Sequence, residues 1–124
     1  MKKVSIQGYK GCFHEQAARL IYGPVEIVEC DTFEDLYKAM AQGRADAAVM
    51  AIENTVSGGL IHNFELLRKN SVKVKGEVYL RIEQNLMALP GQQLEDLKEV
   101  RTHYMAINQT RPWFEQHAPW IRLT

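Results

Sequence analysis

The chain has 124 residues, of which 46% are apolar and 24% charged, which is the composition of one globular domain with its own core. Its 15 Lys and Arg balance 15 Asp and Glu, so no net field would hold it to nucleic acid or to an anionic membrane. Met1-Lys2-Lys3 lacks the apolar stretch of a signal peptide, and the longest apolar run, Ala47 to Ile52, is too short to span a bilayer. We therefore predict a soluble, cytoplasmic protein without a nucleic-acid or membrane partner.

The first half alternates short apolar runs with helical patterns. Strands are predicted at residues 4–7, 25–29 and 47–52, and helices at 14–21, from a Thr32 cap to a Gly43 stop, and at 60–69. The run at 47–52 is continuously apolar, which is typical of a strand buried on both faces. This βαβαβα order predicts a parallel sheet covered by helices, and hence an α/β fold.

The pattern changes near Val72. Residues 72–89 alternate only partially, and we interpret them as a long β segment crossing into a second lobe. A turn at 94–97, a strand at 99–101, a helix from Thr102 to about Gln116 and a strand from 120 are predicted to follow. Pro112 is expected to kink or end that helix.

We therefore divide the chain into a first α/β lobe, 1–77, and the start of a second lobe, 78–124, expected to be truncated. Such a lobe would leave unpaired strand edges around 78–89 and 121–124. Open edges seek partners, so a homo-oligomer is predicted, formed by dimerisation or strand exchange.

The first candidate site is the turn from Gly8 to Cys12, between a predicted strand and a predicted helix. Glycine lets backbone approach a ligand, and a helix start offers N–H groups to an anion. The turn could equally be a plain strand-to-helix connection. His14, in the first helical turn, is interpreted as a neutral donor or a surface histidine.

The second candidate site follows the buried strand, where open α/β sheets bind ligands. Asn54, Thr55 and Ser57 supply uncharged donors, and Gly58 and Gly59 expose backbone N–H groups. Such a cluster suits a carboxylate without requiring a lysine. The same residue types also form ordinary turns.

The third is the segment from Thr102 to Gln109. Thr102 is a plausible helix N-cap, and Gln109 lies two turns further on, so both are expected on one side of the helix. That side could close over a ligand, or it could be a capped helix with a glutamine facing solvent.

Other chemistry has little support in the sequence. The four histidines have no metal-ligand spacing, and no phosphate-binding loop or nucleophile elbow occurs. Cys12 and Cys30 are expected to be free thiols in a reducing compartment. We predict neither a metal nor a cofactor.

The order and spacing of these segments resemble prephenate dehydratases. The most specific string is Ile52-Glu53-Asn54-Thr55-Val56-Ser57-Gly58, supported by the Gly8–Cys12 turn, by Gly76-Glu77 and by Thr102-His103. The resemblance implies a fold like the type II periplasmic binding proteins, with a substrate cleft between two lobes. It also implies the reaction, in which prephenate loses CO2 and water to give phenylpyruvate in phenylalanine biosynthesis.

The resemblance assigns catalytic positions to Asn54, Thr102 and Gln109, and substrate-binding positions to Gly8, Gly11, Cys12, Thr55, Ser57 and Gly58. Cys12 and Thr102 stand where the family usually has serine, and Tyr104-Met105 replaces Pro-Gln.

The family's Thr-Arg-Phe motif and its phenylalanine-sensing ACT domain are not found within the 124 residues. We therefore expect the chain by itself to have no useful dehydratase activity. The alternative is a bilobal binding or sensor domain that uses the same cleft without catalysis.

Overall fold

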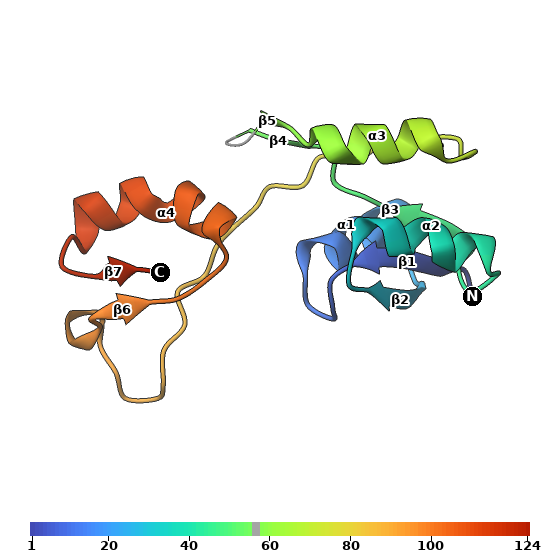
Figure 1. Cartoon of the computed structure of the whole chain (residues 1–124). Helices are drawn as coiled ribbons and strands as arrows, with labels where there is room; N and C mark the ends of the chain where they lie inside the picture. Colours follow the sequence, from blue (N-terminus) through green and yellow to red (C-terminus); the bar gives the residue numbers. More distant parts are fainter. Residues whose placement is uncertain (56–57) are drawn as a thin grey trace. The chain divides into compact units, whose positions relative to one another are not determined.

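The computed structural model of the chain describes residues 1–55 and 58–124 (Figure 1). It forms two compact units, Met1–Ile82 and Glu83–Thr124. The expected lobes, 1–77 and 78–124, remain a prediction, and each unit is described by itself below. None of the described helices combines the length and apolar character needed to cross a membrane.

The first unit is built on a parallel three-stranded sheet, as predicted. The strands, in the spatial order β2-β1-β3, are β1 (Lys3–Gln7), β2 (Glu26–Cys30) and β3 (Ala47–Val49). Helix α1 (Phe13–Tyr22) joins β1 to β2, and α2 (Phe33–Ala41) joins β2 to β3. The Thr32 hydroxyl caps α2 by accepting the Asp35 N–H at 3.2 Å, which confirms the predicted helix start.

The sheet separates two apolar clusters because side chains alternate between its faces. Val4 and Ile6 are fully buried and pack in one cluster with Ala17 and Ala18 of α1. Ser5 points the other way, where its hydroxyl donates to the Leu36 carbonyl of α2 at 3.2 Å. The sheet is therefore covered by a helix on each face.

Strand β3 ends at Val49, earlier than the predicted Ile52. The backbone groups of Ala51 bond to side chains of α1 and α3 instead of to a neighbouring strand. A short antiparallel hairpin follows, made of β4 (Glu53–Asn54) and β5 (Gly58–Gly59), and leads into α3 (Ile61–Lys69). The sequence predicted α3 but not the hairpin.

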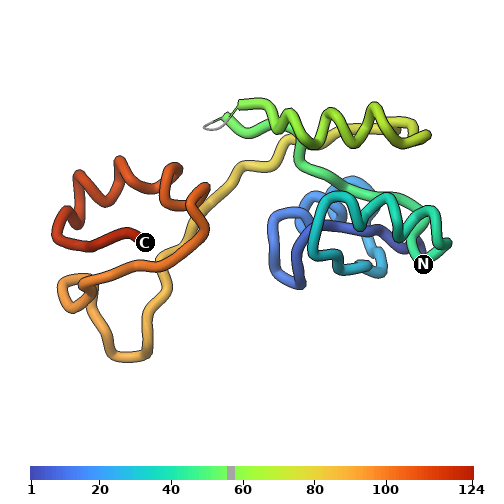
Figure 2. Tube along the Cα trace, in the orientation of Figure 1, coloured from blue at the N-terminus to red at the C-terminus, as the bar shows by residue number. Residues whose placement is uncertain are grey.

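The prediction of a long β segment at 72–89 was wrong. This whole stretch is described, and none of it is paired as a strand. Its partial alternation has another cause: Val78 and Leu80 pack against the apolar cluster on the α1 side, whereas Tyr79 between them is 91% exposed. Figure 2 shows this part of the trace as extended chain.

The second unit is a small parallel β-α-β arrangement. Its elements are the 3-10 turn η1 (Leu94–Asp96), β6 (Glu99–Val100), α4 (Tyr104–His117) and β7 (Arg122–Leu123), with β6 and β7 paired in parallel. Phe114, Ala118 and Ile121 form its buried core.

Two expectations about α4 need correction. The cap is His103, whose Nδ1 accepts the Met105 N–H at 3.1 Å, and Thr102 lies outside the helix. Because Thr102 is not helical, it does not share a helix face with Gln109 as predicted. Of the two effects expected of Pro112, the structure excludes an end to the helix, which continues to His117, and a kink stays a prediction.

Candidate functional site

The turn after β1 is held in shape by glycine geometry. Gly8 has a φ of 116°, a backbone conformation that is strained for residues with a side chain. Its N–H donates to the Cys30 carbonyl at 2.9 Å. A Cβ added at Gly8 would lie 3.2 Å from the Cys12 Sγ. Gly8, Gly11 and Cys12 are thus brought together in one tight turn at the carboxyl end of β1.

Some of the N–H groups in this turn are already engaged. The Gly11 N–H donates to the Glu15 carboxylate at 2.7 Å, and the Cys12 N–H donates to the Tyr9 carbonyl at 3.1 Å. The Gly11 N–H and Arg19, which pairs with Glu15 at 3.0 Å, hold the pKa of the Glu15 carboxyl below its usual range. The Cys12 side chain at the N-cap of α1 makes no capping hydrogen bond, so the first-turn N–H groups of α1 are the part of this wall suited to an anion.

A second set of contacts ties the turn to the loop after β2. The Tyr9 hydroxyl donates to the Asp31 carboxylate, and the Gln7 side-chain amide donates to the Asp31 carbonyl at 3.2 Å. The bond to Asp31 raises the pKa of the Tyr9 phenol. Tyr9 and Asp31 therefore fix the outer side of the turn, a role that the sequence analysis missed.

The hairpin after β3 carries the second group of predicted residues. Asn54 lies in β4 and is half-buried, Thr55 is exposed, and Gly58 begins β5 with a φ of 74°. Ser57 lies outside the described residues. The structure places the predicted donors that it describes on an exposed hairpin beyond the carboxyl end of the sheet.

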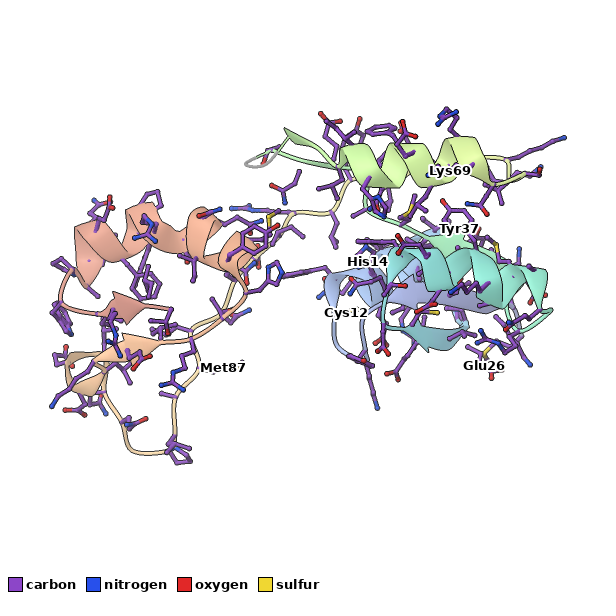
Figure 3. All side chains as sticks on the ribbon, viewed as in Figure 1. Cys12, His14, Glu26, Tyr37, Lys69 and Met87 are labelled. Carbon is purple, nitrogen blue, oxygen red and sulfur yellow. The ribbon has the colours of Figure 1, made fainter. Side chains whose placement is uncertain are left out.

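His14 joins the turn and the hairpin. Figure 3 shows it near Cys12, at the start of α1. Its Nε2 accepts the Ala51 N–H at 3.1 Å, and its ring also bonds to the Gln7 carbonyl at the end of β1. An accepting Nε2 requires the proton on Nδ1, so the imidazole is neutral. Burial lowers the pKa of His14, and the Gln7 carbonyl offsets part of that effect.

Asn63 completes this arrangement from α3. It is only 2% exposed, and its side-chain amide donates to the Ala51 carbonyl at 2.7 Å. Asn63 is not among the site residues predicted from the sequence. The available signal was an asparagine inside a helix, where it is unfavourable unless its side chain has a specific partner.

Thr102 and Gln109 belong to the second unit. Thr102 lies two residues after the end of β6, is exposed, and donates its N–H to the Thr124 carbonyl at 3.2 Å. Gln109 is half-buried, and its side-chain oxygen accepts from the Gln84 amide at 3.0 Å. Their place in one site with Asn54 stays a prediction.

The candidate site in the first unit is an open surface at the carboxyl ends of the parallel strands. Two hollows, of about 520 and 260 Å³, lie elsewhere, one lined by residues between Met87 and Glu99 and the other by residues of α2 and α3 together with Asn70. Neither is lined by a predicted site residue that the structure describes. Cys12 and Cys30 are free thiols. Among the described residues, no group of three His, Cys, Asp or Glu could hold a metal ion.

The fold and the polar groups at its strand ends define an α/β protein of the periplasmic-binding-protein-like class. The chain belongs to the prephenate dehydratase family, whose model matches residues 4–124. It is 36% identical to arogenate dehydratase 2 of Petunia hybrida and 35% identical to arogenate dehydratase/prephenate dehydratase 2 of Arabidopsis thaliana, a chloroplastic protein. Each match covers 86% of the chain, and the chain spans only 27% and 28% of these two relatives.

Two solved structures share the fold. One is described as GqqA, a novel type of quorum quenching acylase, with a TM-score of 0.82 and 27% identity over 99% of this chain and 44% of that chain. The other is prephenate dehydratase from Arthrobacter aurescens in complex with L-Phe, with a TM-score of 0.70 and 27% identity over 98% of this chain and 41% of that chain.

Proposed function

We propose that this chain forms part of the substrate site of a dehydratase that converts prephenate to phenylpyruvate in phenylalanine biosynthesis. Membership of the prephenate dehydratase family supports this assignment. The structural observation that carries it is the pairing of two polar segments, the Gly8–Cys12 turn and the Asn54 hairpin. Each follows a parallel strand, β1 or β3, and the two strands are neighbours in the sheet.

The reaction needs little from the protein beyond binding and help for one leaving group. The bond between the ring and its carboxylate breaks, CO2 leaves, and the electron pair enters the ring as the hydroxyl departs. A proton supplied to that hydroxyl makes it water, and the ring becomes aromatic. Aromatisation drives the step, so no cofactor is required by this chemistry.

The chain's residues suit these tasks. Prephenate carries two carboxylates, and the half-buried Asn54 amide and the exposed Thr55 hydroxyl are neutral donors that can receive one of them. The first turn of α1 suits the other. We assign Gln109 a role in orienting the substrate, and Thr102 a hydrogen bond near the departing hydroxyl.

The substrate proposed is prephenate, and arogenate is the main competitor because the names of the plant relatives include it. The two acids differ on the side chain, where prephenate has a keto group and arogenate has an amino group. Among the described residues, no contact favours a binding domain without catalysis.

The proposal is tested by calorimetry with prephenate, arogenate, amino acids and sugars. We expect prephenate to bind and Asn54→Ala to weaken it about tenfold, the effect of losing one hydrogen bond to a charged group. Gln42→Ala is the matched control, because Gln42 carries an amide at the amino edge of the sheet, where its oxygen accepts from Arg44. Equal prephenate affinity in Asn54→Ala and the wild type would contradict the proposal, and so would preferential binding of a sugar.

We also propose that the protein forms a homo-oligomer and works in the cytoplasm. With no strand at 72–89, support for assembly comes from the two-stranded β6–β7 sheet, in which each strand is paired on one side only among the described residues. Light scattering over a concentration series tests assembly, and a strictly monomeric mass would contradict it. Fractionation of the source cells tests localisation.

A further inference from the structure

We propose that His14 and Asn63 form a clamp on Ala51 that positions the Asn54 hairpin for the substrate. This inference rests on the proposed function, and it makes His14 and Asn63 positioning residues rather than catalytic ones. Neither is among the residues that the sequence assigns to the site.

The clamp holds both backbone groups of a single residue. His14 from α1 accepts the Ala51 N–H at 3.1 Å, and Asn63 from α3 donates to the Ala51 carbonyl at 2.7 Å. Ala51 lies between the end of β3 and the start of β4. Backbone groups at such a position usually bond to a strand, to water or to a turn, and here two separate helices supply the partners.

The hairpin depends on this anchor because it is too short to order itself. β4 and β5 contribute two residues each, and an isolated two-stranded hairpin is at best marginally stable in water. Its base is closed by the Leu60 N–H, which donates to the Ile52 carbonyl at 2.8 Å. The clamp lies one residue before that closure and thus sets where the hairpin leaves the sheet.

His14 also connects the hairpin to the other binding wall. It is two residues after Cys12, its ring bonds to the Gln7 carbonyl, and it packs edge-on against Phe33 with ring centroids 5.6 Å apart. The His14 ring therefore has three partners, which are the Gln7 carbonyl, the Phe33 ring and the Ala51 N–H. Through this one side chain, the Gly8–Cys12 turn and the Asn54 hairpin keep a fixed separation.

The test compares two substitutions at His14. Phenylalanine fills the volume but accepts no hydrogen bond, whereas glutamine can place an oxygen near the Nε2 position and accept from Ala51. Asn63→Leu removes the other half of the clamp. His62→Gln is the matched control, since exposed His62 is adjacent to Asn63 but pairs with Glu34 on the surface.

Amide hydrogen exchange measured by NMR reads the clamp without any ligand. We expect the Ala51 amide to be protected in the wild type and in His14→Gln, and to exchange about tenfold faster in His14→Phe. The amides of Asn54 and Gly58 should likewise be protected in the wild type and in His14→Gln. They should exchange faster in His14→Phe and in Asn63→Leu. The amides of Ile6 and Ile27 in the paired strands report whether the unit remains folded.

Measuring the prephenate affinity of each variant then shows whether the clamp positions the hairpin for binding or only contributes to packing. We expect about tenfold weaker binding in His14→Phe and Asn63→Leu, with His14→Gln and His62→Gln within about twofold of the wild type. Wild-type affinity in His14→Phe, with Ile6 still protected and Ala51 exposed, would overturn the positioning role.

The two proposals fail in different ways. Absence of prephenate binding in the wild type would refute the proposed function alone, because exchange at Ala51, Asn54 and Gly58 still decides whether the clamp orders the hairpin. Unchanged exchange at Asn54 and Gly58 in both His14→Phe and Asn63→Leu would refute the clamp.

Discussion

The protonation state of His14 links the site to the stability of the first unit. Its folded pKa lies below the ordinary value of 6.5 because burial disfavours the charged ring. At pH values between the folded pKa and 6.5, the unfolded chain therefore binds more protons at His14 than the folded chain does. The free energy of unfolding is thus highest above pH 6.5 and decreases as the pH falls below it.

We expect urea unfolding of the wild type to show a lower midpoint at pH 5.5 than at pH 7.5, and His14→Gln to lose most of that difference. The pKa values of Glu15, Glu34 and Asp35 are lowered from 4.5, 4.5 and 3.8. Their effect on the free energy of unfolding therefore changes mainly at a pH below the range in which His14 titrates. An equal drop in midpoint for wild type and His14→Gln would show that His14 does not control this transition.

Gly8 is the residue on which the shape of the turn most depends. Alanine there meets both a strained φ of 116° and the Cys12 Sγ at 3.2 Å, whereas alanine at Gly11 meets a φ of 92° and open space. We expect Gly8→Ala to lower the free energy of unfolding by about 1–3 kcal/mol and Gly11→Ala by about 1 kcal/mol. Denaturant unfolding measures both. A smaller loss at Gly8 than at Gly11 would contradict the assigned geometry.

At the scale of elements, Glu99 joins β6 to β7. Its carboxylate accepts from Arg101 and Arg122 at 2.9 and 2.8 Å and from the Thr124 hydroxyl at 2.9 Å. These hydrogen bonds lower the pKa of Glu99 to about 2. Its contribution to stability is therefore complete above the ordinary pKa of 4.5 and is lost as the pH falls toward 2.

We expect an NMR titration of the Glu99 carboxyl to have its midpoint near 2 in the wild type. Replacing Arg101 and Arg122 with glutamine should return it toward 4.5. A wild-type midpoint near 4.5 would show that Glu99 does not keep its hydrogen bonds to these three partners in solution.

The sequence predicted the elements whose signals are local. Thr32 caps its helix as expected, and the three strands of the parallel sheet and helices α1, α2 and α3 follow one another in the predicted order, whereas the β4–β5 hairpin was not predicted. Patterns that depend on tertiary partners were misinterpreted. Val78 and Leu80 alternate because one side of an extended chain packs on the α1 cluster, and alternation alone does not supply a strand partner.

The end of β3 and the start of α4 show the same limit at single residues. Ala51 leaves the strand because His14 and Asn63 bond to its backbone groups, and the sequence does not indicate that Ala51 is the partner of either side chain. At α4, Thr102 has the usual N-cap residue type, yet the His103 imidazole supplies the acceptor. The predicted site residues that the structure describes in the first unit lie at strand ends, while Asn63, Tyr9 and Asp31 required the fold to be identified.

At the scale of the whole molecule, the family assignment and the site support each other. The family model spans residues 4–124, and the residues that we propose for the site come from both structural units. In the first unit, we propose that neutral donors and a helix start at the carboxyl end of a parallel sheet receive a small dicarboxylate. In the second, Thr102 follows β6 in a corresponding position, at the carboxyl end of a parallel strand.

The most direct test of the central claim is an NMR titration of the isotopically labelled chain with prephenate. We predict that the largest amide shifts fall on the Gly8–Cys12 turn, on His14 and Ala51, and on the Asn54 hairpin. Shifts confined to the hollow between Met87 and Glu99, with the carboxyl edge of the first sheet unchanged, would contradict the claim that this edge receives the substrate.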